Sequence, residues 1–359
     1  MSNLSRADHA FLDAMLQGVS RTFALTIPQL PPSLYHVVAT AYLLCRIADT
    51  IEDDPALDHK ATRAFSERLI AVVEGRTSAA EFAHALAPRL SGVSLAAERR
   101  LVAETERVIR IKGRFSEQSQ RRLEVCVRTM AVGMSHYQQR ASLRGLDDMP
   151  DLDRYCYVVA GVVGECLSAL FALEIPQLRT AQRRLQPLAV SFGQGLQMTN
   201  ILKDIWADAE RGVCWLPRAV FEDYGVGLEP LLSGAPSAAA TGAFTTLIAI
   251  AQAHLERGLH YTLAIPAAHR GVRHFCLWAL GMAVLTLRKL HKQRVVQPGK
   301  PVKISRSALR ATIVFSRLFA GHDTALRWAF SRLGEGLPKL TEAQRRRYLD
   351  AGKIGELPR

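Results

Sequence analysis

The stretch SAAATGAFTTLIAIAQAHLERGLHYTLA, residues 237–264, shows the pattern that decides the fold. Its apolar side chains Phe244, Leu247, Ile248 and Leu255 recur at spacings of three and four, the periodicity of one face of an α-helix. Strand signals are weak, because no Asn-Gly or Asp-Gly pair joins two alternating runs. The helical periodicity recurs in residues 33–53, 95–112, 117–141, 152–173, 188–211 and 273–293. The sequence therefore predicts an all-α fold.

Composition limits the function classes. The chain has 359 residues, of which 48% are apolar and 22% charged, so it can build a large core and is not a disordered chain. A formal net charge of +13 predicts an anionic partner, which is nucleic acid, a lipid surface or a phosphorylated small molecule. Aromatic residues are only 7% and lie mostly in apolar runs, so a base-stacking nucleic-acid-binding protein is the weaker alternative.

The domain organisation is simple. No composition shift or fixed repeat divides the chain, so we expect one all-helical domain over residues 1–333 and a polar, poorly ordered tail over 334–359. Six cysteines form no C-x-x-C pair and lie mostly in apolar stretches, which indicates buried, reduced thiols in a cytosolic protein. The apolar runs 157–173, 230–253 and 275–287 are short or interrupted, so we expect buried helices rather than membrane spans.

The first informative segment is RIADTIEDDP, residues 46–55. Asp49 and Asp53 are four residues apart and share a helix face, with Glu52 at its edge. Pro55 places these acids in the last helical turn, where the helix dipole disfavours negative charge. A bound Mg²⁺ would reverse that penalty, because Mg²⁺ takes carboxylate oxygens and substrate phosphates as ligands. The alternative is a solvated helix end that carries several acids.

The second segment is QMTNILKDIWADAER, residues 197–211. Asn200, Asp204 and Asp208 repeat at four-residue spacing and form a polar stripe on a largely apolar helix. Such a stripe is costly unless it is paired or binds metal, and the alternative is a set of salt bridges such as Asp208 with Arg211.

Together the two segments predict two helices that face each other across a cavity and hold Mg²⁺ around a diphosphate leaving group. The basic residues nearby are candidate phosphate contacts, although each of them also suits a surface ion pair. These candidates are Arg21, Arg46, Lys203 and Arg211.

With SRTFA at residues 20–24, AYLLCRIADTIED at 41–53, YCYVVAGVVG at 155–164 and QMTNILKD at 197–204, the chain resembles the squalene/phytoene synthase family. The resemblance covers roughly residues 15–310 in motif order. It implies an all-α isoprenoid synthase bundle with a central cavity, in which two prenyl diphosphates are joined head to head with Mg²⁺. The sequence departs from the usual pattern at Ala207, where Glu is common, and at Lys203, where Arg is common.

The resemblance also assigns roles. It implies metal binding by Asp49, Glu52, Asp53, Asn200, Asp204 and Asp208, and catalytic roles for the four aspartates among them and for Tyr155. Tyr155 would steer the first condensation; the alternative is a core tyrosine. Gly161 and Gly164 would let a prenyl chain or a helix approach closely. The expected substrate contacts are Ser20, Arg21, Phe23, Tyr42, Arg46, Val159, Val163, Gln197, Lys203, Arg211 and Phe275.

Which hydrocarbon the enzyme would form depends on whether it uses a reductant. Within this family, squalene-forming members use NADPH, whereas dehydrosqualene- and phytoene-forming members do not. The basic run 292–306 resembles the segment associated with NADPH, so we expect Lys303 and Arg306 to contact it; the alternative is a solvated or membrane-facing loop. We favour the formation of squalene from two molecules of farnesyl diphosphate, in sterol or hopanoid biosynthesis. A catalytically inactive relative is the remaining alternative, but it would be expected to lose one acidic pair.

The expected setting follows from the tail and the charge. The final residues 352–359 contain no apolar span. We expect a soluble, bacterial-type cytoplasmic monomer with no nucleic-acid partner. Basic residues would give it peripheral contact with the inner membrane face.

Overall fold

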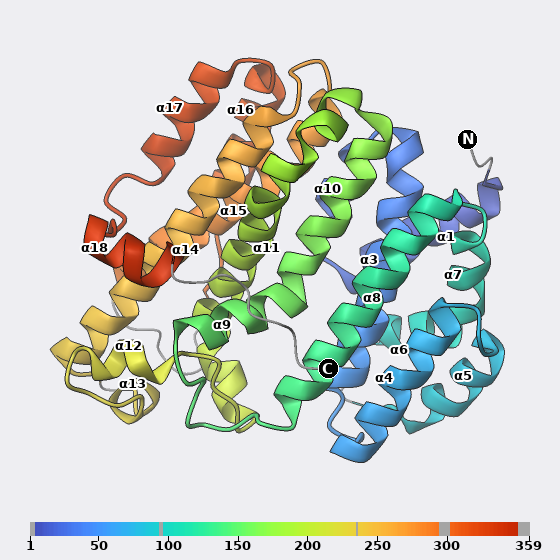
Figure 1. Ribbon diagram of the computed structural model, residues 1–359, viewed down its shortest axis with the longest axis horizontal. Helices are drawn as coiled ribbons and strands as arrows, with labels where there is room; N and C mark the ends of the chain where they lie inside the picture. The colour runs from blue at the N-terminus through green and yellow to red at the C-terminus, as the bar shows by residue number, and fades with distance from the viewer. Residues whose placement is uncertain (1–3, 93–95, 235, 294–301, 351–359) are drawn as a thin grey trace. The chain divides into compact units, whose positions relative to one another are not determined.

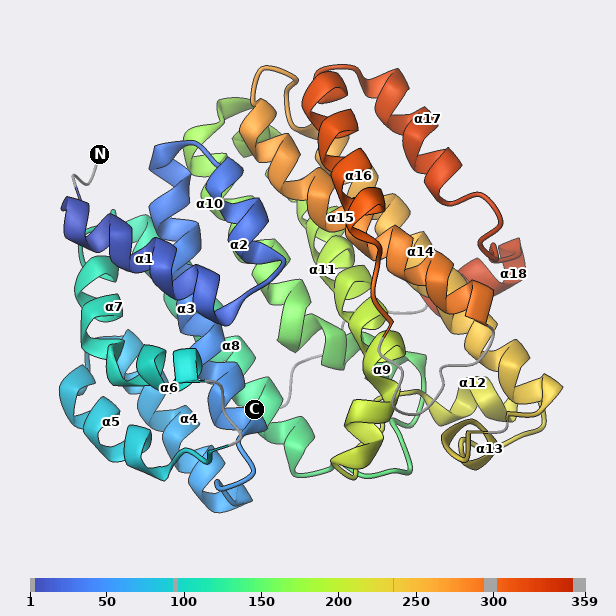
Figure 2. The same ribbon diagram turned by 180° about the vertical axis from the view of Figure 1, so that it is seen from behind.

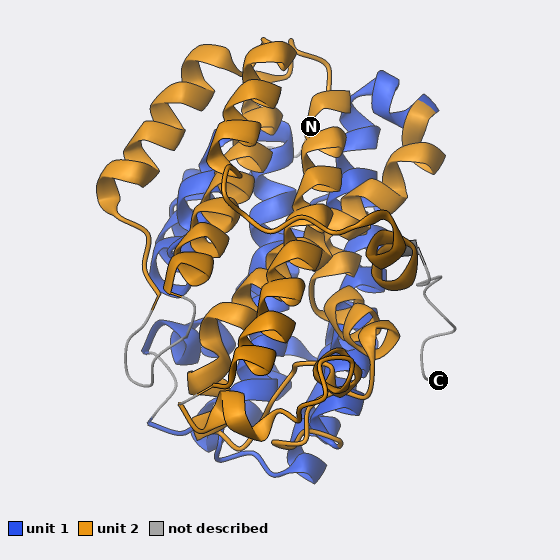
Figure 3. Ribbon diagram, turned by 90° about the vertical axis from the view of Figure 1, so that its left-hand side faces the viewer, with its two compact units in different colours: residues 1–139, 166–180 blue, residues 140–165, 181–359 orange. Residues whose placement is uncertain are grey.

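The computed structural model describes residues 4–92, 96–234, 236–293 and 302–350. Helices account for every named element in these ranges, and the one β pairing there is an isolated bridge between Leu146 and Pro217. The chain is all-α, as the periodicity predicts (Figure 1). Its contacts divide it into two compact units, coloured in Figure 3, and the expectation of a single domain stays a prediction.

Unit 1 comprises residues 1–139 and 166–180. Its long helices α3 and α8 pack against each other, and α4 packs along α8. Fully buried α3 side chains such as Leu43 and Ile47 form the centre of its core, and each contributes about 1.5–3 kcal/mol by burial. Its elements are α1 (Arg6–Val19), α2 (Phe23–Thr26), η1 (Ile27–Gln29), α3 (Pro32–Asp53), α4 (His59–Val73), α5 (Ala79–Leu86), η2 (Ala87–Arg89), α6 (Ala96–Ala103), α7 (Thr105–Lys112), α8 (Glu117–Gln138) and most of α10 (Val162–Glu174).

Unit 2 comprises residues 140–165 and 181–359. Its core is the packing of α14 on α15, with α16 against α15. Ser237 caps α14 by accepting a hydrogen bond from the Ala240 amide, so the predicted helix begins where the sequence indicates. Its elements are α9 (Met149–Cys156), η3 (Tyr157–Gly161), most of α11 (Pro176–Glu210), α12 (Arg218–Glu222), α13 (Glu229–Leu232), α14 (Ala238–Ala264), α15 (Arg270–Gln293), α16 (Arg306–Phe319), α17 (Asp323–Leu333), α18 (Glu342–Arg345) and η4 (Arg346–Asp350).

The described part of the tail, residues 334–350, contains helical structure that was not expected. Residues 342–350 form α18 and a π-helical turn, and they are tied to unit 2 by ion pairs. Arg345 pairs with Glu256 at 3.3 Å and Arg347 with Asp223 at 2.6 Å. Tyr348 donates a hydrogen bond to the same Asp223 carboxylate. The polar composition of the tail predicts disorder. The ion pairs that hold it could not be foreseen, because their partners lie about a hundred residues away in the sequence.

Two helical stretches are long and apolar enough to span a membrane by composition. They are Met149–Glu174 and Ala238–Ala264, with 56% and 72% of their most apolar windows buried inside the protein. Core helices of soluble proteins pass the same test, and the burial of Ala238–Ala264 agrees with the expectation of a core helix.

Candidate active site

The first acidic segment ends α3 in unit 1. Proline at its first position suits a helix start, and Asp54 is the residue that caps its end, so Asp49, Glu52 and Asp53 lie in the last turn as predicted. Asp53 is exposed, whereas Asp49 and Glu52 are half-buried. The helix end is therefore not a uniformly solvated set of acids.

Arg46 connects this segment to the expected substrate contacts. Its guanidinium lies 3.6 Å from Asp49 and donates a 3.1 Å hydrogen bond to the Tyr42 hydroxyl. Tyr42 in turn donates to the Val19 carbonyl, and its ring lies 5.1 Å from that of Phe23. The structure thus brings four predicted site residues into one connected array.

The surroundings of Asp49 disfavour its charged form. Burial raises the pKa of Asp49 to about 6; Arg46 opposes the rise, and Asp53 and Glu98 add to it. Burial lowers the pKa of Arg46, but Asp49, Tyr42 and Glu98 outweigh that effect and raise it. A divalent cation would stabilise the charged form of this carboxyl, so the donor set fits Mg²⁺.

Ser20 and Arg21 lie where α1 meets α2. The Ser20 hydroxyl accepts a 2.9 Å hydrogen bond from the Phe23 amide, which begins α2. Arg21 is exposed. Their place beside Phe23 agrees with the expected grouping of Ser20, Arg21 and Phe23, but contact with substrate stays a prediction.

Sequence reasoning missed two acids in unit 1. The Glu98 carboxylate on α6 lies 3.9 Å from the Arg46 guanidinium, and the Glu98 side chain is 17% exposed. No local sequence motif indicates this contact. Asp54 belongs to the acidic run but has a structural role, because its buried carboxylate accepts hydrogen bonds from Ser91 and from the Ala56 amide. A run of acids cannot reveal which member faces inward.

The second acidic segment lies on α11 in unit 2. Helix geometry places Asn200, Asp204 and Asp208 on one face, together with Gln197 and Arg211. Asn200 is exposed, Asp204 is half-buried and Asp208 is buried. The salt bridge given above as the alternative to metal binding is present, because the Arg211 guanidinium lies 2.7 Å from the Asp208 carboxylate. The Lys203 ammonium likewise lies 2.7 Å from the Asp204 carboxylate. Carboxylate side chains and basic side chains therefore lie next to each other along this segment.

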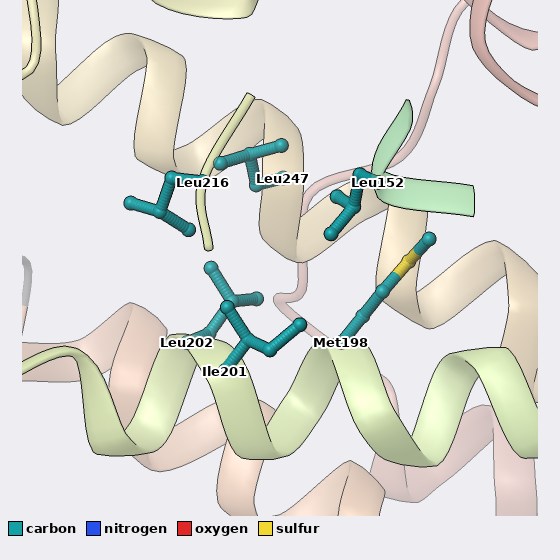
Figure 4. Close-up of a pocket in the computed structure, with 6 residues that line it drawn as sticks. All are labelled: Leu152, Met198, Ile201, Leu202, Leu216 and Leu247. Atoms are coloured by element: carbon teal, nitrogen blue, oxygen red, sulfur yellow. The ribbon is translucent and has the colours of Figure 1, made fainter. Parts of the chain in front are cut away.

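A small pocket lies on a different face of α11. Its cavity volume is about 10 Å³, far below the roughly 300–1,000 Å³ of ordinary ligand pockets. Figure 4 shows its apolar lining of Leu152, Met198, Ile201, Leu202, Leu216 and Leu247. It carries no polar side chain for a diphosphate, so we assign it to the packing of unit 2.

Tyr155 is buried at the end of α9 and stacks on Trp215, with ring centroids 4.2 Å apart. This contact agrees with the alternative of a core tyrosine, and a role in proton transfer stays a prediction. A π-helical turn, Tyr157–Gly161, follows directly and contains half-buried Val159. Such turns are frequent at functional sites, and the sequence pattern gave no sign of it.

The remaining predicted contacts are spread through unit 2. Val163 on α10 is half-buried and Phe275 on α15 is buried. Lys303 and Arg306 are exposed at the start of α16. Residues 294–301 of the basic run lie outside the described residues, so the expected NADPH contacts stay predictions.

The side-chain oxygens of the two acidic segments are the expected ligands of Mg²⁺. Among the described residues, no three His, Cys, Asp or Glu side chains converge on a point that could hold a metal. Mg²⁺ is usually held by one or two carboxylates, waters and substrate phosphates, so the oxygen-rich segments still suit it. The two segments belong to different units, and the central cavity between facing segments stays a prediction.

Comparisons with known proteins place this chain in a class. A family model described as squalene/phytoene synthase matches residues 16–308. The chain belongs to the squalene/phytoene synthase family and is a prenyltransferase.

Three similar proteins refine the comparison. A squalene synthase of Eremothecium gossypii is 27% identical over 314 residues, covering 86% of this chain and 67% of that protein. A solved complex of TcSQS with a ligand is 25% identical with a TM-score of 0.74, covering 96% of this chain and 98% of the other. A dehydrosqualene synthase crystal structure is 20% identical with a TM-score of 0.61, covering 88% and 96%, and supports the fold alone.

Proposed function

We propose that this enzyme condenses two molecules of farnesyl diphosphate head to head, through cyclopropyl presqualene diphosphate, and reduces that intermediate to squalene with NADPH. The observation that carries the proposal is the similarity to squalene synthases along 86% of the chain, with both acidic segments present. Formation of dehydrosqualene or phytoene without a reductant is the second candidate, because the family model that matches the chain describes squalene and phytoene synthases together.

Each segment has a defined task in this reaction. Asp49, Glu52 and Asp53 would hold Mg²⁺ at the end of α3, and Asn200, Asp204 and Asp208 would hold it on α11. Bound Mg²⁺ would neutralise the diphosphate as its carbon–oxygen bond breaks. Arg46, with its guanidinium already fixed by Asp49 and Tyr42, would bind phosphate oxygens.

The first condensation also releases a proton. The C1 carbon of one farnesyl diphosphate, after losing diphosphate, is attacked by the double bond of the second, and loss of a proton closes the cyclopropane. Tyr155 is the proposed acceptor or relay for that proton, and its stacking on Trp215 would hold the phenol in place. In the second step the cyclopropyl diphosphate would lose its diphosphate and rearrange. Lys303 and Arg306 would hold NADPH, which would supply the hydride for the resulting cation.

The decisive experiment is product identification after incubation with farnesyl diphosphate and Mg²⁺, with and without NADPH. Squalene formed only with NADPH is the expected result. Dehydrosqualene made without reductant, or phytoene from geranylgeranyl diphosphate, would establish the second candidate instead. The cytoplasmic location and the monomeric state stay predictions.

Matched variants test the acidic segments in the same assay. Asp49→Asn and Asp204→Asn should each lower diphosphate release by about a hundredfold or more, because each removes a charged metal ligand. Asp58→Asn is the control, since Asn caps α4 as well as Asp does. Activity of either site variant within a few-fold of the Asp58 variant would contradict the assignment.

A further inference from the structure

The outer face of the α16–α17 pair exposes large apolar side chains. Val314, Leu318 and Trp328 are 56%, 65% and 60% exposed, and Phe319 is 37% exposed. Nine large apolar residues are exposed in the described part of the chain, and these four lie within fifteen positions of one another. α16 and α17 contact each other, and Figure 2 shows them as consecutive helices joined by a short connection. Apolar groups gathered in this way mark an interaction surface.

This face is also strongly basic. Residues 302–335 contain six Lys and Arg and two acids. Both acids already have partners, because Asp323 pairs with Arg273 and Glu335 with Arg332, each at 2.7 Å. Helix geometry places Arg310 one turn before Val314 on α16, which has no acidic residue, whereas the Arg317 guanidinium lies 5.5 Å from the centre of the Trp278 ring on α15. The surface therefore combines exposed apolar groups with flanking positive charge.

The pair is firmly held, so its exposure is not a frayed end. The buried Arg273 donates hydrogen bonds to the Ala320 and Ile265 carbonyls at 2.8 and 2.7 Å, which ties the α16–α17 junction to the end of α14. Trp278 on α15 donates a 2.6 Å hydrogen bond to the Ser316 hydroxyl. The inner face of the pair is thus fixed by buried contacts, and the opposite side presents the apolar and basic groups.

We propose that the α16–α17 outer face docks onto an anionic phospholipid surface. Val314, Leu318 and Trp328 would enter the interface, and arginines such as Arg310 and Arg327 would reach the phosphates of the head groups. Charge complementarity selects a lipid surface, because basic residues flank the apolar groups on both helices and neither acid is unpaired. This inference does not rest on the proposed function.

The test is co-sedimentation of the full chain with vesicles of phosphatidylglycerol and phosphatidylcholine, and with phosphatidylcholine alone. The parent should bind only the anionic vesicles and be released by salt. The double variant Val314→Ser with Leu318→Ser should bind at least about tenfold more weakly, because two apolar side chains lose their buried area. Arg310→Gln with Arg327→Gln should also weaken binding by about tenfold or more.

Controls use equally exposed residues elsewhere. Val125→Ser on α8, at a site 60% exposed, and Arg121→Gln should bind like the parent. Trp328→Phe should keep binding but remove most of the blue shift in emission, which the other three tryptophans would not supply. Circular dichroism melting confirms that each variant is folded.

Several outcomes would overturn the proposal. These are a parent that ignores anionic vesicles, a parent that binds neutral vesicles equally well, and surface variants that bind like the controls. A change in oligomeric state in the Val314→Ser, Leu318→Ser double variant, without vesicle binding by the parent, would assign the face to a second copy of the chain.

Discussion

Asp153 and His254 form a buried pair of titratable residues in unit 2. The His254 Nε2 atom lies 3.8 Å from the Asp153 Oδ1 atom, too far for a hydrogen bond, and the other ring nitrogen of His254 is 2.8 Å from the Ser191 hydroxyl. Burial raises the pKa of Asp153 to about 7 and lowers that of His254 to about 3. Both groups are therefore neutral in the folded protein near pH 5.

In the parent protein, the opposite pKa shifts of Asp153 and His254 should cancel in the pH dependence of the free energy of unfolding. Between about pH 4 and 6.5 the unfolded chain carries its proton on His254, and the folded chain carries it on Asp153, so folding releases no net proton. In Asp153→Asn only His254 changes its proton on folding, because the unfolded chain binds a proton there and the folded chain does not. The free energy of unfolding should therefore fall as the pH drops from 6.5 toward 4, by up to about 1.4 kcal/mol per pH unit. Urea unfolding at a series of pH values measures this slope.

The complementary variant should reverse the sign. His254→Gln leaves Asp153 with a raised folded pKa, so stability is greatest near pH 4 and declines as the pH rises toward 7. Equal slopes in both variants and the parent would show that neither group changes its proton on folding.

At the scale of single residues, the sequence predicted those positions and contacts that depend only on residues a few places away in the chain. The spacing of Asp49 and Asp53 before a proline places them correctly in the last turn of α3. The pairing of Asp208 with Arg211 also follows from helical spacing. Glu98, Trp215 and the Asp153–His254 pair could not be predicted, because their partners are distant in sequence and no periodicity relates them.

At the scale of elements, the packing of η3 and the start of α10 against α11 depends on glycine. A Cβ atom added to Gly164 would lie 2.2 Å from the Ala189 carbonyl oxygen, and one added to Gly193 would lie 2.3 Å from that of Ala160. Backbone atoms cannot move aside as a flexible side chain can, so the two helical segments would have to separate. The sequence suggested that Gly164 admits a helix or a prenyl chain, and in unit 2 it admits a helix.

Adding a methyl group at this contact should be costly. Gly164→Ala and Gly193→Ala should each destabilise the protein by about 1–3 kcal/mol, despite the higher helix propensity of alanine. Guanidinium unfolding measures the change. Gly92→Ala is the control, since nothing lies within 4 Å of its added Cβ. Site variants as stable as the Gly92 variant would refute the close-packed contact.

Element boundaries were predictable where caps and prolines mark them. Pro31 and Pro32 mark the start of α3, and Ser237 marks that of α14. The expected helix over 95–112 is divided at Glu104 into α6 and α7, and α11 continues through Pro187. Tertiary packing decides such cases, because local propensity is a weak term beside burial.

At the scale of the whole molecule, the six cysteine thiols are divided equally between the two units. All six cysteines are buried thiols that form no disulfide, as the sequence predicts. Unit 1 contains Cys45, Cys126 and Cys166, and unit 2 contains Cys156, Cys214 and Cys276. The all-α class and the buried thiols follow from composition and periodicity, whereas the division into units depends on contacts between distant segments.

Thiol labelling should therefore report the opening of each unit. Burial raises the pKa of Cys214 to about 11 and that of Cys276 to about 12, so thiolate is scarce even where reagent enters. Native protein should react with a thiol reagent at least about a thousandfold more slowly than protein in denaturant, where all six cysteines should react. An added cysteine at exposed Ser307 is the matched control for reagent quality and should react at once. Mass spectrometry assigns each label, and fast labelling of either group of three in native protein would contradict a closed core in that unit.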